Sequence, residues 1–185
     1  MIYFVRHALD DERYVGSWSD VSILESEKDK VKEVAHKIKN LQISGIITSD
    51  ITRARETAEI IGKELSLKVV RDNSLREQNK GTLTGKRRDA LSKEELDLLA
   101  SKDINTVFPG GESLLDVYKR IRRYLNTIDT FPDKTLVVTH RGVINMIYYI
   151  LNDIPPDMEK ERFDVGHLSV HEYDIKKKLI RRIIW

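Results

Sequence analysis

The chain has 185 residues, of which 40% are hydrophobic and 34% are charged, so it can bury a sizeable core and is too apolar for a disordered chain. Its 32 basic and 30 acidic residues leave a formal charge of only +2, which disfavours a nucleic-acid partner. The absence of cysteine excludes disulfide scaffolds, thiolate metal sites and cysteine nucleophiles. The length fits one domain (1–185), and the lack of cysteine leads us to expect a cytoplasmic protein. Because no apolar run reaches about 18 residues, we expect no membrane partner.

Four short apolar runs lack the alternation of half-exposed strands, which predicts strands buried on both faces. They are residues 2–5, 46–48, 69–70 and 136–139. Between them, apolar residues recur every three or four positions, and this period predicts helices. The helical patterns lie within residues 31–41, 54–65, 114–128 and 142–152. Strands that alternate with helices predict an α/β fold, a three-layer αβα sandwich with a mostly parallel central sheet.

Two further segments complete the chain. Residues 79–105 are polar and rich in Lys, Arg and Asp, and we expect a partly helical segment that crosses above the sheet as a lid. Residues 168–173 and 179–185 are apolar runs separated by a polar turn, which predicts a C-terminal hairpin.

Polar side chains follow three of the predicted strands. Arg6 and His7 come directly after the first strand, Arg53 follows the second within a few residues, and His140 follows the fourth. Because the carboxyl ends of parallel strands meet at one edge of a sheet, we expect these four side chains on one rim. Guanidinium groups and a helix N-terminus suit a phosphoryl group, and a histidine nitrogen can attack it.

The order of these motifs resembles that of the histidine phosphatase superfamily, also called the phosphoglycerate mutase-like family. The resemblance covers nearly the whole chain and rests on Arg6-His7-Ala8, residues 49–58, Leu75-Arg76-Glu77, residues 109–113 and residues 137–144. It implies a phosphoglycerate mutase-like fold, in which His7 is the phosphorylated nucleophile and Arg6, Arg53 and His140 hold the phosphate. It also implies that Glu77 protonates the leaving oxygen and later activates water, with Glu112 as a competing carboxylate.

Several residues depart from the family pattern. Asp10 stands where the family often has Thr or Ser, and Arg13 stands where it often has Asn, in a loop that touches the substrate in the family. An acid repels phosphate, so we expect Asp10 either to point away or to pair with Arg13. Trp18, in the same loop, either lines the substrate pocket or packs at its rim. We therefore treat these three residues as candidates for substrate specificity.

The two histidines near the C-terminus, His167 and His171, are expected to be structural, and the sequence offers no partner ligand that would make them a metal site. We expect no metal and no cofactor.

The function that these residues favour is a metal-independent phosphatase of small phosphorylated metabolites, acting as a monomer or homodimer. One alternative is a phosphoglycerate mutase, which would require 2,3-bisphosphoglycerate as cofactor. The others are a protein phosphohistidine phosphatase and a non-catalytic module that binds phosphorylated ligands. The presence of both a nucleophile and an acid argues against the last, since binding alone needs neither.

Overall fold

The protein is built on one six-stranded sheet, seen in a computed structural model that describes residues 1–157, 159 and 162–184. The strand order is β3-β2-β4-β1-β5-β6. The strands are β1 (Ile2–Arg6), β2 (Gly45–Thr48), β3 (Val69–Arg71), β4 (Thr135–Thr139), β5 (Val170–Asp174) and β6 (Leu179–Ile184). Strands β1 to β4 are parallel to one another, whereas β5 pairs antiparallel with β1 and β6 pairs antiparallel with β5, which confirms the mostly parallel sheet.

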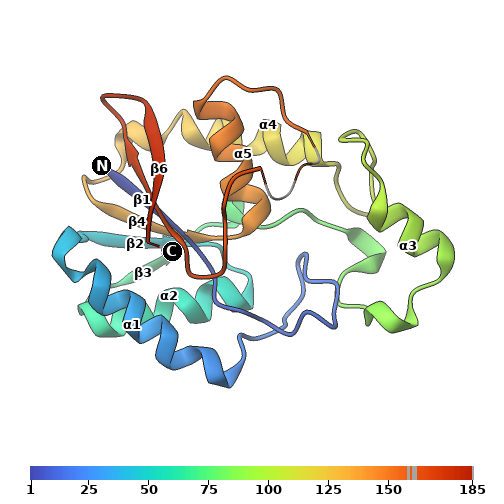
Figure 1. The fold of residues 1–185 in the computed structure, drawn as a ribbon, viewed down its shortest axis with the longest axis horizontal. Coiled ribbons are helices and arrows are strands. Elements are labelled where there is room, and N and C mark those ends of the chain that lie inside the picture. The colour runs from blue at the N-terminus through green and yellow to red at the C-terminus, as the bar shows by residue number, and fades with distance from the viewer. Residues whose placement is uncertain (158, 160–161, 185) are drawn as a thin grey trace.

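Helices cover both faces of the sheet (Figure 1). One layer consists of α1 (Lys28–Ile38) and α2 (Thr52–Leu65), and the other of α4 (Leu114–Leu125) and α5 (Arg141–Leu151). Alternate side chains of β1 enter the two cores: Ile2 and Phe4 pack with α4 and α5, while Tyr3 and Val5 pack with α1 and α2. Both faces of β1 are therefore buried, as its unbroken apolar run predicts, and the three-layer sandwich is confirmed.

Some details differ from the sequence-based expectation. The prediction that residues 69–70 form a strand buried on both faces is wrong, because β3 is an edge strand and Val70 is 61% exposed. Strand β5 begins at Val170 rather than at Leu168, because Leu168 has a left-handed backbone (φ 60°) that interrupts an extended strand. Helix α4 ends at Leu125, and a separate 3₁₀ turn follows at Ile128–Thr130. Trp185, the predicted end of the last strand, lies outside the described residues.

Residues 79–105 form a segment at the far end of the molecule from the two chain termini (Figure 1). The segment contains α3 (Lys93–Ala100), which begins with a capping box between Ser92 and Glu95, and two 3₁₀ turns. A small separate core of Val15, Leu83 and Phe108 holds it against the loop that follows β1. The prediction of partial helix is confirmed, and closure over the sheet stays a prediction.

None of the helices in the described part of the chain is long and apolar enough to cross a lipid bilayer.

Candidate active site

The carboxyl ends of β1 and β4 bring two histidines together. The two strands are parallel neighbours with Arg6 opposite Thr139, so the next residues, His7 and His140, lie side by side with ring centroids 5.1 Å apart. His140 is completely buried at the start of α5, and its Nε2 lies 2.9 Å from Ser49 Oγ. Its Nδ1 has no hydrogen-bond partner among the described residues. Strand register therefore produces the pair of imidazoles that the sequence predicts.

The imidazole of His7 is held in one tautomer. Its Nδ1 lies 2.7 Å from the carbonyl oxygen of Ala8, which can only accept, so Nδ1 carries the proton and Nε2 is unprotonated. Burial lowers the pKa of His7 well below its usual 6.5, and the positive charges of Arg53 and Arg6 lower it further. The ring is therefore neutral at pH 7, and Nε2 is available as a nucleophile.

Arg53 reaches the same place from the first turn of α2. Its Nε donates to His7 Nε2 at 3.2 Å and its Nη2 donates to the carbonyl oxygen of Ser17 at 2.8 Å. Its Nη1 is buried and has no partner among the described residues. A buried donor without a partner costs about 1–3 kcal/mol, which a bound anion would relieve.

Arg6 approaches from the other side of His7. Its Nη1 donates to the carbonyl oxygen of Val165 at 2.9 Å, and its Nη2 lies 2.6 Å from His167 Nε2. Burial lowers the pKa of Arg6 to about 10, so the group stays charged at neutral pH. Its Nε is a second buried donor without a partner in the described chain. The two charged guanidinium groups therefore lie beside one imidazole, which suits an oxyanion.

His167 lies beside this cluster, a placement that the expectation of a structural role did not include. Its ring centroid is 5.5 Å from that of His7, and burial lowers its pKa to about 3, with Arg6 contributing further. The neutral ring can accept the hydrogen bond from Arg6. No sequence signal finds it, because 159 residues lie between it and His7 and only the pairing of β5 with β1 brings them together. His171, by contrast, lies buried between Tyr148 and Ser169, in agreement with the prediction of a structural role.

Glu77 faces the two arginines from the segment after β3. Its Oε2 accepts from the backbone N–H of Gly142 at 3.1 Å, and its Oε1 accepts from that of Gln78 at 3.0 Å. A Cβ at Gly142 would lie 2.2 Å from Glu77 Oε1, so only glycine permits this approach. The competing carboxylate, Glu112, binds the guanidinium of Arg120 at 3.0 Å instead.

The loop after β1 departs from expectation at Asp10. This carboxylate neither points away nor pairs with Arg13: its Oδ2 lies 3.4 Å from Arg53 Nε, and Arg13 binds Asp11 instead. The expectation is wrong because the loop after β1 lies against α2, which brings Asp10 to Arg53. Trp18 is 37% exposed and donates from its indole to the carbonyl oxygen of Glu77 at 2.7 Å.

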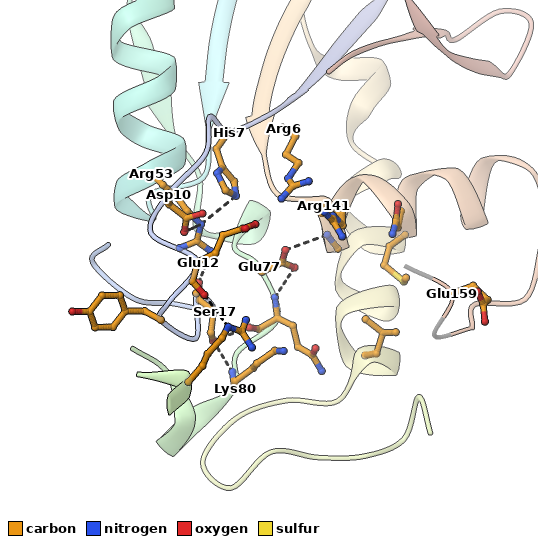
Figure 2. Close-up of a pocket in the computed structure, with 18 of the residues that line it drawn as sticks. Arg6, His7, Asp10, Glu12, Ser17, Arg53, Glu77, Lys80, Arg141 and Glu159 are labelled. Carbon is orange, nitrogen blue, oxygen red and sulfur yellow. Dashed lines mark hydrogen bonds and ion pairs between the residues drawn. The ribbon is translucent and has the colours of Figure 1, made fainter. Parts of the chain in front are cut away.

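These groups line one cavity of about 500 Å³ (Figure 2). Its wall includes Arg6, His7, Asp10, Glu12, Tyr14, Gly16, Ser17, Arg53, Glu77, Gln78, Lys80, Arg88, Leu114, Arg141, Gly142, Asn145, Met146, Tyr149, Asp157 and Glu159. Arg13, Trp18 and His140 are not part of this wall, although His140 supports His7 from behind. The cavity is large enough for a phosphoryl group together with a sizeable organic group.

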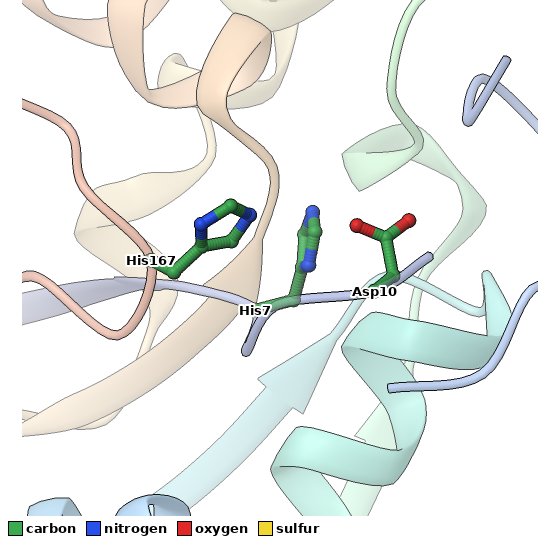
Figure 3. A group of neighbouring side chains, drawn as sticks. All are labelled: His7, Asp10 and His167. Carbon is green, nitrogen blue, oxygen red and sulfur yellow. The ribbon is translucent and has the colours of Figure 1, made fainter. Parts of the chain in front are cut away.

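His7, Asp10 and His167 stand in a row (Figure 3), and their possible ligand atoms lie within 4.8 Å of one another. The acceptor atoms of all three already face guanidinium nitrogens of Arg53 or Arg6. A dication placed here would meet two fixed positive charges, whereas an anion would be attracted by both. The electrostatics of the cluster therefore favour an anion over a metal ion.

The fold and the site define an α/β protein with a histidine-centred anion site at the carboxyl ends of its parallel strands. Residues 2–185 match the family model of the histidine phosphatase superfamily (branch 1). The chain belongs to this superfamily.

Curated relatives and solved structures agree with this membership. A protein of Erwinia tasmaniensis named "Probable phosphoglycerate mutase GpmB" is 29% identical over 181 residues, which cover 94% of this chain and 84% of the relative. The structure of Bacillus stearothermophilus YhfR superimposes with a TM-score of 0.83 at 23% identity, covering 99% of this chain and 95% of the other. A mycobacterial glucosyl-3-phosphoglycerate phosphatase gives a TM-score of 0.73 at 23% identity, covering 100% and 97%. At these identities the two structures establish the fold.

Proposed function

We propose that the protein is a metal-independent phosphatase that hydrolyses small phosphomonoesters through a phosphohistidine at His7. The observation that carries the proposal is the unprotonated Nε2 of His7 in a cavity that the guanidinium groups of Arg6 and Arg53 also line. Phosphoryl transfer depends mainly on positioning and on stabilising charge, and both guanidinium groups are already in place.

The proposed reaction has two steps. His7 Nε2 attacks phosphorus, the ester P–O bond breaks, and Glu77 gives a proton to the departing alkoxide. Water, deprotonated by Glu77, then attacks the phosphohistidine, so that the P–N bond breaks and inorganic phosphate leaves. Arg6 and Arg53 bind the phosphoryl oxygens in both steps, and His140 supports the nucleophile from behind.

Replacement of His7 tests the proposal. We expect His7→Ala to abolish hydrolysis of p-nitrophenyl phosphate while orthovanadate still binds weakly, because both guanidinium groups remain. His36→Ala is the matched control, since the His36 side chain is 68% exposed on α1. Turnover that survives in His7→Ala would show that the nucleophile is wrongly assigned.

A mutase is the second candidate, and the relative named for that activity is the observation that favours it. A mutase must return the phosphoryl group from the histidine to a second hydroxyl, so it retains what a phosphatase releases. Measuring free phosphate and the isomerisation of 3-phosphoglycerate, with and without 2,3-bisphosphoglycerate, separates the two. Isomerisation faster than phosphate release would reject the phosphatase.

A further inference from the structure

The wall of the cavity below His7 carries two carboxylates from one short acidic run. In the run Asp10-Asp11-Glu12, the first and third side chains line the cavity. Figure 2 shows Asp10, Glu12 and Glu77 around the space beside His7. Asp11, between them, binds Arg13 on the outside at 2.6 Å. Any group attached to a phosphate at His7 must therefore share the cavity with these two acids.

Asp10 brings negative charge to the position where the phosphate is proposed to bind. It is 9% exposed, and its carboxylate lies within 4.8 Å of a ring nitrogen of His7. The same carboxylate lies 3.4 Å from Arg53 Nε, so part of the positive charge of Arg53 is compensated before any substrate arrives.

The charges on the whole wall are nearly balanced. Of its described residues, five are basic and five are acidic, the histidine is neutral, and protonation of Glu77 as the proposed acid leaves an excess of one positive charge. A phosphate dianion therefore uses the positive groups nearest His7 and leaves no surplus for another anion. A cavity suited to phosphoglycerates would need more basic than acidic side chains, because these compounds carry a carboxylate beside the phosphate.

We propose that Asp10 and Glu12 are specificity residues that reject leaving groups with a second anionic group and direct the enzyme to phosphomonoesters of uncharged alcohols. The inference rests on the proposed phosphatase activity and names its substrate class. Two unit charges about 7 Å apart, at an effective dielectric constant of about 20, repel strongly enough to produce a discrimination of tenfold or more.

Two nearly isosteric esters isolate this effect. Glycerol 3-phosphate and 3-phosphoglycerate differ in a hydroxymethyl group against a carboxylate at the far end of the leaving group. We expect kcat/KM at pH 8 to be roughly tenfold or more higher for glycerol 3-phosphate. Asp10→Asn should reduce this ratio about fivefold or more, and Glu12→Gln should also reduce it. Asp11→Asn, the matched control outside the cavity, should leave the ratio unchanged.

The pH dependence of the ratio gives a second readout, which a purely structural role would not produce. Burial raises the pKa of the Asp10 carboxyl, while Arg53 on α2 and Arg6 at the end of β1 oppose the rise and Glu12 adds to it. Burial lowers the pKa of the neighbouring His7 and His167, so neither ring gains a charge near neutral pH. The wild-type ratio should therefore fall as the pH is lowered from 8 and Asp10 takes up a proton, at a higher pH than an exposed aspartate would, whereas the ratio of Asp10→Asn should change less.

The outcomes separate this inference from the function on which it rests. A wild-type ratio near one, or a ratio that Asp10→Asn leaves unchanged in a folded protein, overturns the inference alone, provided that p-nitrophenyl phosphate is hydrolysed. If no ester is hydrolysed, the proposed function fails. Calorimetric affinities of the same two esters for the wild type and Asp10→Asn then decide whether the two acids discriminate against the second charge.

Discussion

Gly142→Ala is expected to damage the proposed acid while leaving the anion site intact. The new Cβ would lie 2.2 Å from Glu77 Oε1, whereas ordinary contacts begin near 3.4 Å, so the carboxylate must retreat by about 1 Å. It would then lose the hydrogen bond from the Gly142 N–H, now 3.1 Å long. A misplacement of about 1 Å at a reacting group can cost about 10²-fold in rate, and we expect kcat to fall by that order.

The assay is the hydrolysis of p-nitrophenyl phosphate, with orthovanadate inhibition as the measure of anion binding. Inhibition should stay within about threefold of the wild type, because Arg6 and Arg53 are untouched. Alanine is the better helix former by about 1 kcal/mol, which offsets part of the strain, so the melting temperature should change little. Gly45→Ala, where no atom lies within 4 Å of the added Cβ, is the control. Wild-type turnover in Gly142→Ala would refute the reasoning, as would a further loss when it is combined with Glu77→Gln.

Three further predictions concern the histidines around the site. Burial lowers the pKa of His171 to about 4, so below about pH 6.5 the unfolded chain takes up a proton that the folded chain does not. Folding stability should therefore fall as the pH drops from 6.5 towards 4, by up to about 3 kcal/mol from this residue, and urea denaturation of His171→Gln should show a shallower pH dependence. Tyr148→Phe removes the donor 2.9 Å from His171 Nδ1 and should cost about 1–3 kcal/mol in the same measurement. His167→Ala frees one end of Arg6 and should raise KM for phosphate esters about tenfold with a smaller change in kcat; a fall in kcat with unchanged KM would contradict a role in positioning Arg6.

The local pattern of the chain was sufficient for most of its helices and strands. Helix α4 illustrates this, because its apolar period and the Ser113 cap both act within a few residues. Strand β3 shows where the local pattern fails. Val70 is exposed because β3 lies at the edge of the sheet, and the position of a strand within a sheet cannot be read from its own residues.

The candidate site divides in the same way. Arg6, His7 and His140 could be placed together from sequence, because each directly follows a strand and neighbouring parallel strands end at one edge. Arg53 follows the same logic through the start of α2. The balance of charge in the cavity could not be foreseen, since Asp157 and Glu159 reach its wall from a distant part of the chain.

The sequence by itself determined the class of fold, the nucleophile candidate and the cations beside it, because these depend on periodicity and on the ends of strands. Only the tertiary structure decided that His167 supports Arg6 and that Asp10 pairs with Arg53 rather than with Arg13. The physical reason is that an ionic or hydrogen-bond partner is selected by distance in space and by burial. Both of these are set by how the β1 loop lies over α2 and how β5 pairs with β1, and neither follows from the neighbours of a residue along the chain.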